Sequence, residues 1–457
     1  MQDILTWINT IIWGIPVLIL ILGVGIWLSL RTGGAQIRLI PLALRNFFKS
    51  FKIEDSKGIT GYKALCTALA ATVGTGNIAG VAGAICLGGP GVIFWMWMSA
   101  LLGMGIKLAE VTLAVHYRTT DAQGRFLGGP MYMISKGLPM KYHFLSYIYC
   151  FFGIIAAFGI GNATQVNAVI GGVKNIASAA HYELKPMQIV LIGVITAGLV
   201  YTAFSKGAEG IGNWAQRLIP FASGAYIFMS IGVLIACRSK LIESFVAIIS
   251  GAFSPKAVTG GIIGSLFLTL RVGVSRGIFT NEAGMGTASI AHAASEVNHP
   301  VLQGLLGIVE VFLDTIVICT LTALVVLCSN VSIPFGTDPG INLTMDAFSC
   351  VYGNWCNILI AILTGIFAFA TILGWGLYGA RCAQYLFGEK AWRFFAAAQA
   401  VCILVSVVLE TSVVWVFSEL VNGLMAIPNL FALILLSPVF FKILKDYMTK
   451  KEAYSLR

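Results

Sequence analysis

The fold is decided by the stretch TALAATVGTGNIAGVAGAI, residues 67–85, where an apolar helical sequence is interrupted at Val73-Gly74-Thr75-Gly76-Asn77. Two glycines around a threonine remove helix propensity and let the backbone approach a ligand closely. Because hydrocarbon offers a free backbone group no hydrogen-bond partner, such a break is tolerated in a membrane only beside a cavity. The helix ends at such a break present N–H groups to an anion and C=O groups to a cation.

The composition is typical of an integral membrane protein. Of 457 residues, 58% are hydrophobic and 11% are charged, and the mean hydropathy is +0.88. Soluble domains carry about 25% charged residues, so the chain is not a water-soluble globule. The net charge of +10 comes from Lys and Arg in short loops between apolar runs. This distribution indicates membrane topology and argues against nucleic-acid binding.

Apolar runs of about 20 residues predict an all-α polytopic membrane protein with about eleven spans. The spans lie near residues 10–30, 64–86, 91–116, 143–175, 187–204, 212–237, 258–292, 301–328, 355–383, 391–410 and 413–442. Between the first two, basic and apolar residues alternate over residues 38–52, which predicts an amphipathic helix on the cytoplasmic leaflet. The positive-inside rule then places the N-terminus outside the cell and the C-terminus in the cytoplasm.

The chain is expected to divide into two related halves. Residues 1–58 hold the extra N-terminal span and the amphipathic helix, residues 59–240 and 241–445 hold five spans each, and residues 446–457 form a cytoplasmic tail. Because five is odd, a structural repeat must be inverted in the membrane. The first span of the second half is also interrupted, at RVGVSRGIFTNEAG, residues 271–284. Interrupted spans at corresponding positions of two halves point to a transport site between inverted repeats.

At these motifs the chain resembles the alanine/glycine:cation symporters, also called sodium:alanine symporters. The resemblance rests on residues 67–81, Gly88-Gly89-Pro90-Gly91, Gly128-Gly129-Pro130-Met131-Tyr132, residues 276–287, Asp314-Thr315 and Gly374-Trp375. It implies a leucine-transporter-type fold with ten core helices in a five-plus-five inverted repeat. It also implies sodium-coupled uptake of small neutral amino acids across a bacterial or archaeal plasma membrane, and it implies no obligate protein partner.

A dehydrated amino-acid zwitterion needs donors for its carboxylate and acceptors for its ammonium group. The candidate substrate-binding residues are Gly74, Thr75, Gly76, Asn77, Gln165, Phe279, Asn281 and Trp375. Backbone N–H groups of the first break and the Thr75 hydroxyl suit the carboxylate, and carbonyls near Ile278 and Phe279 suit the ammonium. The alternatives are that Thr75 bonds to its own helix, that Gln165 and Asn162 join helices, and that the aromatic side chains only pack.

For the coupling ion, the resemblance implies sodium between the first broken span and the ninth span. The candidate ligands are carbonyl or hydroxyl oxygens at Ala71, Gly74, Phe367, Ala368 and Thr371. Relatives are expected to carry two adjacent hydroxyl residues where this chain has Ala370-Thr371. A proton in place of sodium therefore stays open at this stage.

Charged residues inside spans are costly and are functional candidates. The spacing of Lys107 and Glu110 predicts an ion pair between them, and Arg276 is expected to pair with Glu282 or Asp314. Glu282 is expected to cap the helix that resumes after the second break. We interpret these charges as gate or scaffold rather than as direct ligands.

An enzyme is not indicated, because the sequence contains no phosphate-binding loop, nucleophile elbow or zinc-binding helix motif. A glutamine transporter of the same family, coupled to sodium or protons, is the main alternative. A passive channel is a weaker one, since a channel more often builds its filter around a symmetry axis.

Overall fold

The computed structural model describes residues 15–51, 59–179, 181–254, 266–337, 339–408 and 411–455, and nearly all of them lie in helices. One short antiparallel hairpin, β1 (Thr119–Thr120) and β2 (Phe126–Leu127), joins two helices. The predicted all-α class is confirmed. Several expected features extend beyond the described residues: the first span before residue 15, the end of the amphipathic helix at Lys52, the first boundary at 58 and the start of the span at 258–292.

Seven stretches of helix in the described residues are long and apolar enough to cross a membrane. They comprise α7 (Val92–His116), α9 to α10 (Phe144–Phe158, Thr164–Ala179), α11 (Pro186–Ser205), α12 (Gly207–Ala236), α16 to α17 (Pro300–Val311, Thr320–Cys328), α19 (Cys356–Phe387) and α21 (Thr411–Ser455). Two shorter apolar helices, α2 (Ile15–Arg31) and α20 (Ala391–Ser406), stand beside them. With the two broken spans, these elements occupy the predicted span positions.

The first broken span consists of α5 (Gly61–Thr72), the π-helical segment η1 (Gly76–Gly80) and α6 (Val81–Gly88). Its two halves are bent by 54° at the break, where Val73 adopts an extended conformation. The second consists of α14 (Leu266–Asn281) and α15 (Thr287–Ala293), separated by residues 282–286. Both predicted interruptions are confirmed.

The second interruption lies further along the chain than predicted. Helix α14 continues through Ile278 and Phe279, and the Glu282 N–H donates to the Ile278 carbonyl at 2.8 Å. The chain leaves the helix at Glu282 and Gly284, whose φ angles are 53° and 94°. The Ile278 carbonyl is therefore bonded within the helix, and the prediction that the break frees it is wrong.

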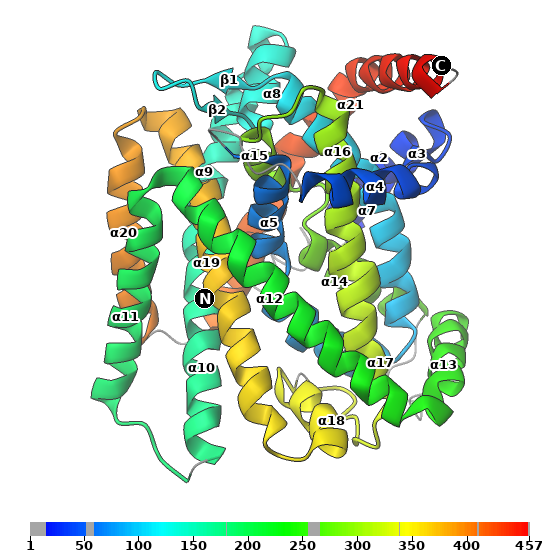
Figure 1. Cartoon of the computed structure of the whole chain (residues 1–457), viewed down its shortest axis with the longest axis vertical. Coiled ribbons are helices and arrows are strands. Elements are labelled where there is room, and N and C mark those ends of the chain that lie inside the picture. Colours follow the sequence, from blue (N-terminus) through cyan, green and yellow to red (C-terminus); the bar gives the residue numbers. More distant parts are fainter. Residues whose placement is uncertain are drawn as a thin grey trace.

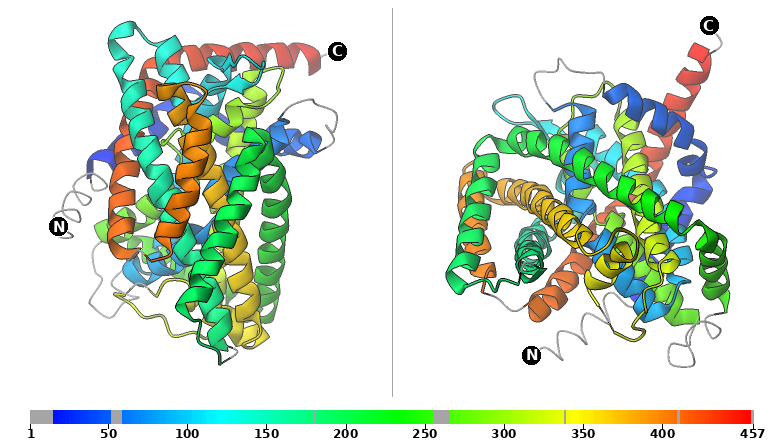
Figure 2. Two further views of the ribbon diagram at one scale, coloured as in Figure 1. Left: turned by 90° about the vertical axis from the view of Figure 1, so that its left-hand side faces the viewer. Right: turned by 60° about the horizontal axis from the view of Figure 1, so that its bottom comes forward.

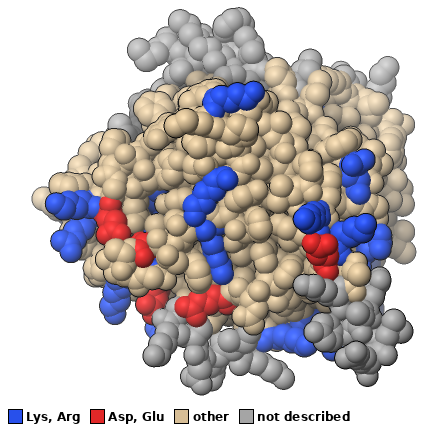
Figure 3. Space-filling model, turned by 90° about the horizontal axis from the view of Figure 1, so that it is seen from above, with Lys and Arg blue, Asp and Glu red and all other residues tan. Residues whose placement is uncertain are grey.

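The remaining helices cover the two ends of the bundle (Figure 1). At one end lie the β-hairpin, α8 (Pro130–Gly137), α3 (Ala35–Arg38), α4 (Ile40–Ser50) and the C-terminal part of α21. At the other end lie α13 (Leu241–Phe253) and α18 (Asn342–Tyr352). Figure 3 shows that Lys and Arg side chains outnumber Asp and Glu on the first end. The amphipathic helix and the C-terminal tail, both predicted to be cytoplasmic, thus lie at the same end of the molecule in the part of the chain that the structure describes.

Close backbone contacts at glycines position the broken spans. A Cβ on Gly273 of α14 would collide with the Val92 carbonyl of α7. A Cβ on Gly307 of α16 would lie 3.1 Å from the Lys107 side chain on the opposite part of α7. Small residues of this kind let membrane helices pack through their backbones. Helix α7 therefore holds the second broken span on one side and α16 on another.

Candidate functional site

The first break is closed by the side chain of Asn77. The Gly74 N–H donates to the Asn77 Oδ1 at 2.8 Å, and the Gly74 carbonyl accepts from the Asn77 N–H at 3.2 Å. The Gly74 N–H is therefore engaged, and a substrate carboxylate would have to replace Asn77 as its acceptor. The prediction of a free N–H at this residue is wrong for this conformation.

Thr75 sits in the break without an internal partner. Its side chain makes no hydrogen bond to any described residue, although only 9% of the residue is exposed. By contrast, the hydroxyl of nearby Thr72 bonds back to the Ala68 carbonyl at 3.3 Å. The alternative in which Thr75 bonds back to its own helix is thus not what the structure shows. A nearly buried hydroxyl with unused donor and acceptor capacity is suited to a ligand.

A buried carboxylate joins the two breaks. Asp314, in the π-helical segment η6 (Phe312–Cys319), accepts from the Asn77 Nδ2 at 2.7 Å and from the Thr315 hydroxyl at 2.8 Å. Thr315 in turn accepts from the Asn281 Nδ2 at 3.1 Å. The Asn281 Oδ1 accepts from the Ala283 N–H at 3.0 Å, so each asparagine also caps its own break.

Sequence reasoning missed this role of Asp314 and instead grouped it with gate or scaffold charges. The available signal was a carboxylate in the middle of an apolar span, followed directly by a threonine. Such a carboxylate is costly unless polar partners surround it. Packing of η6 against both breaks supplies those partners.

Gln165 turns back on the polypeptide beside it. Its Nε2 donates to the Ile160 carbonyl at 3.1 Å, whereas its Oε1 is buried and has no partner among the described residues. Asn162, in the π-helical segment η3 (Gly159–Ala163), donates to the Gln399 carbonyl at 3.1 Å. Asn162 therefore joins η3 to α20, while Gln165 keeps a free acceptor.

The two aromatic candidates lie in different surroundings. Trp375 of α19 is 2% exposed. A Cβ on Gly161 of η3 would collide with Trp375, so the indole is packed directly against η3. Phe279 is half-buried, and its ring lies 6.0 Å from the Arg276 guanidinium carbon.

The predicted ion-binding residues come together where α5 ends against α19. A Cβ on Gly74 would lie 2.9 Å from the Thr371 Oγ1, and a Cβ on Gly374 would lie 2.8 Å from the Ala71 nitrogen. The Thr371 hydroxyl donates to the Phe367 carbonyl at 3.0 Å, and Ala368 beside it is fully buried. The absence of a side chain on Gly74 leaves room there for oxygen ligands from both helices.

A buried ion pair locks α7 to α16. The Lys107 Nζ lies 3.2 Å from the Glu310 Oε1, and the His292 Nε2 of α15 lies 2.9 Å from the Glu310 Oε2. All three side chains are fully buried. The predicted Lys107–Glu110 pair is therefore wrong, since the partner of Lys107 comes from another helix.

The other buried charges also have partners that spacing did not predict. Glu110 accepts from the Asn429 Nδ2 at 2.6 Å and from the Gly286 N–H at 3.1 Å, which makes it the cap of α15. Glu282, the predicted cap, instead accepts from the Thr287 hydroxyl at 2.6 Å. Arg276 lies 3.7 Å from Glu419 of α21, so its predicted pairing with Glu282 or Asp314 is wrong.

Three comparisons with known proteins agree with this architecture. The profile of the Sodium:alanine symporter family matches residues 1–456. The sodium/alanine symporter AgcS of Methanococcus maripaludis is 41% identical over 437 residues, with 94% of each chain covered. The probable sodium/glutamine symporter GlnT of Bacillus subtilis is 35% identical over 461 aligned positions, covering 99% of this chain and 93% of that protein. The crystal structure of MhsT in complex with L-phenylalanine has a TM-score of 0.58 at 14% identity, covering 85% of this chain and 99% of that chain.

Two helix breaks that meet inside an all-α membrane bundle define a secondary transporter, and the likeness to MhsT shows that its fold is of the leucine-transporter type. The family profile and the relative AgcS match nearly the whole length of the chain, which identifies its family. It belongs to the sodium:alanine symporter family.

The ion pair between α7 and α16 predicts how the fold responds to loss of one charge. Lys107→Met should destabilise the protein by about 3–5 kcal/mol, because it leaves the Glu310 carboxylate buried without its lysine. Lys107→Met/Glu310→Gln should recover most of that loss, since both charges are removed. Thermal unfolding of the purified protein in detergent measures both effects. Exposed Lys141→Met is the control, and equal destabilisation in the single and double variants would contradict the pairing.

Proposed function

We propose that the chain is a symporter that uses a sodium gradient to take up alanine or glycine by alternating access. The observation that carries the proposal is the polar chain Asn77–Asp314–Thr315–Asn281. It links both helix breaks beside the junction of Gly74 with Thr371. Substrate and ion sites that share one break are coupled directly, because Gly74 belongs to both.

The proposed substrate site lies around the first break, with the carboxylate on Thr75 and the backbone of Gly74 and Gly76. Asn77 moves off the Gly74 N–H when the carboxylate binds. The unpartnered Gln165 Oε1 is an acceptor for the ammonium group, with Asn281 at the second break. Trp375 and Phe279 limit the size of the substrate side chain. Using dipoles rather than full charges keeps the cost of dehydrating the site low.

The proposed ion site uses oxygen ligands, as a hard cation such as sodium prefers. Carbonyl oxygens of Ala71, Gly74, Phe367 and Ala368 and the hydroxyl of Thr371 are the candidate ligands. Ala370 provides no second hydroxyl, so Thr371 carries the whole side-chain contribution. No carboxylate is needed for the charge, because several carbonyl dipoles surround the ion.

The orientation in the plasma membrane follows the distribution of basic residues. The end with the β-hairpin and the C-terminal helix is proposed to face the cytoplasm, with the N-terminus outside. Residues 59–240 and 241–445 are proposed as the two inverted repeats, preceded by the unit 1–58 and followed by the tail 446–457. Each repeat then begins with a broken span.

Uptake of labelled alanine into proteoliposomes tests the function. An inward sodium gradient should drive accumulation above equilibrium, whereas an equal potassium gradient should not. Downhill flux alone would contradict symport and favour a channel. Accumulation driven by a proton gradient in the absence of sodium would identify the coupling ion as a proton.

Glutamine is the second candidate substrate, because the relative GlnT carries that name at 35% identity. The same liposomes distinguish the two substrates when unlabelled alanine, glycine and glutamine compete with the labelled alanine. Strong competition by alanine and glycine and weak competition by glutamine support the main proposal.

Thr75→Val removes a hydroxyl of the proposed carboxylate site at nearly constant volume. The half-saturating alanine concentration should rise by about 10- to 100-fold, because a dehydrated carboxylate loses a charge-assisted hydrogen bond. Thr75→Ser, which keeps the hydroxyl, is the matched control. Unchanged uptake kinetics in the valine variant would remove Thr75 from the site.

Thr371→Ala removes the single side-chain ligand of the proposed ion site. The sodium concentration for half-maximal uptake should rise by about tenfold or more, whereas the order of preferred amino acids should stay the same. A sodium titration of alanine uptake measures this, with Thr371→Ser as the control. An unaltered titration in the alanine variant would place the ion elsewhere.

A further inference from the structure

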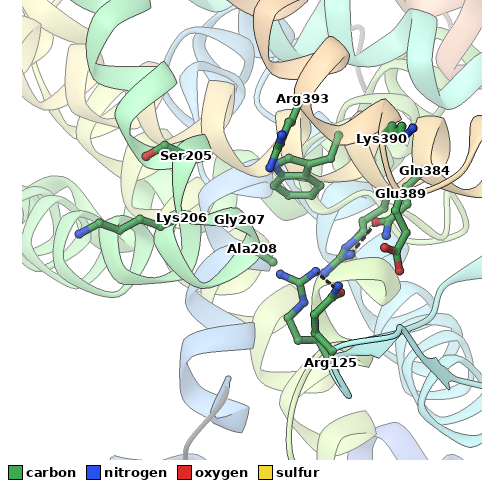
Figure 4. A pocket seen from close by; sticks show the side chains of 12 residues that line it. Arg125, Ser205, Lys206, Gly207, Ala208, Gln384, Glu389, Lys390 and Arg393 are labelled. Atoms are coloured by element: carbon green, nitrogen blue, oxygen red, sulfur yellow. Dashed lines mark hydrogen bonds between the residues drawn. The ribbon is translucent and has the colours of Figure 1, made fainter.

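A pocket of about 570 Å³ (Figure 4) lies at the end of the bundle that carries the β-hairpin, and no residue of either helix break lines it. It is formed by the hairpin loop, the turn between α11 and α12, and the turn between α19 and α20. Its lining residues that matter here are Arg125, Gly207, Arg381, Glu389, Lys390 and Arg393. None of them has a part in the transport site described above.

The pocket is strongly basic. Five Lys or Arg residues line it, and Glu389 is the one carboxylate among the lining residues. The Arg125 guanidinium donates to the Gln123 Oε1 at 3.0 Å, whereas Lys206 points away from Gln384 and Glu389 in Figure 4. Lys206 also lines a neighbouring pocket with Arg217. The positive-inside rule explains basic residues at this end, but it does not require them to converge on a cavity.

Arg381 is a buried cation in the wall of the pocket. Only 8% of it is exposed, and its Nη1 donates to the neutral Gln384 Oε1 at 2.7 Å. Its guanidinium carbon lies 5.3 Å from the Trp392 ring centroid. Within the described part of the chain, no carboxylate lies within 4.0 Å of it. A buried cation without a counter-charge is costly, so the site favours an anion.

The nearby carboxylates are already engaged. Although burial acts in the opposite direction, hydrogen bonds from the Arg125 backbone and guanidinium lower the pKa of Asp121. Asp121 and Arg125 are 2.8 Å apart and neutralise each other. The Glu389 Oε1 accepts from the Ala122 N–H at 3.5 Å. The charge of Arg381, Lys390 and Arg393 is therefore only partly compensated.

The walls of the pocket are fixed in the absence of any ligand. The Trp392 indole donates to the Phe204 carbonyl at 3.2 Å, which ties the start of α20 to the end of α11. Helix α12 begins at Gly207 without a side-chain cap, and Glu209 in its first turn offsets part of the positive end of its dipole. A preformed site of this kind binds a ligand with little ordering cost.

We propose that this pocket binds a phosphate group at the membrane surface. Arginine forks match phosphate oxygens in a bidentate geometry, and the cavity is large enough for a phosphorylated headgroup. The surroundings favour an anionic phospholipid as the source. Phe387 and Phe394, next to the pocket in sequence, are 74% and 76% exposed, and α11 and α20 form the outer flank of the bundle (Figures 1 and 2). Acyl chains can therefore lie against apolar surface while the headgroup enters the pocket.

Thermal unfolding of the full-length protein in a neutral detergent tests the proposal. Short-chain phosphatidylglycerol should raise the unfolding temperature by about 2–5 °C at saturation, and phosphatidylcholine of the same chain length should not. Lys390→Gln/Arg393→Gln should weaken the apparent lipid affinity at least tenfold. Both side chains are exposed, so this variant should fold. Arg381→Gln, which removes the buried charge of the pocket, should also weaken the apparent lipid affinity at least tenfold.

The matched control is Lys136→Gln/Lys141→Gln, which removes the same charge from exposed positions outside the pocket and should keep the full shift. Inorganic phosphate forms the second arm. A shift with phosphatidylglycerol but not with phosphate identifies a lipid headgroup, and an equal shift with phosphate that depends on Lys390 and Arg393 identifies a soluble phosphate compound. Absence of any shift in the unmodified protein, or equal loss in the pocket and control variants, overturns the proposal.

Discussion

Polar backbone at the two helix breaks must find partners inside the protein, because neither hydrocarbon nor the close-packed bundle provides water there. Asparagine side chains do this at both breaks, since Asn77 bonds to Gly74 and Asn281 bonds to Ala283. Threonines complete the first break: the Thr322 hydroxyl donates to the Asn77 carbonyl at 2.8 Å. The arrangement of η6 beside both breaks follows from this requirement.

A backbone group that bonds to a side chain can change its partner more easily than one that bonds within a helix. A side-chain amide can rotate away from a backbone group without unfolding a helix, so the Gly74 N–H can exchange Asn77 for a ligand at low cost. A carbonyl such as that of Ile278, bonded within α14, has no such freedom. The residues that can change partners are therefore those at the breaks, where the proposed substrate site lies.

The sequence predicted features that depend on neighbouring residues, such as a helix break. It did not predict features that depend on how separate helices pack. The Gly74-Thr75-Gly76 interruption was predictable because two glycines weaken the helix at that point. Gly277 looked similar in α14, yet there it allows close packing on α7, where a Cβ would collide with Ser99. Likewise, Lys107 and Glu110 have the spacing of a helical ion pair, but Gly307 brings α16 so close that Glu310 becomes the partner. The network through Asp314 joins residues more than 200 positions apart, which no spacing rule can reveal.

The buried carboxylates fall into two kinds, and the difference bears on which elements can move. Glu310 is held by charged Lys107, and separating that pair would leave two charges unpaired in a low dielectric. Asp314 and Glu110 are held by amides, a hydroxyl and a backbone N–H, which other neutral groups or water can replace. Helices α7 and α16 are therefore the rigid scaffold of the proposed transport cycle. The two breaks bond to the Asp314 and Glu110 carboxylates through amide and backbone N–H groups. They are the parts that can rearrange at a cost that substrate and ion binding can offset.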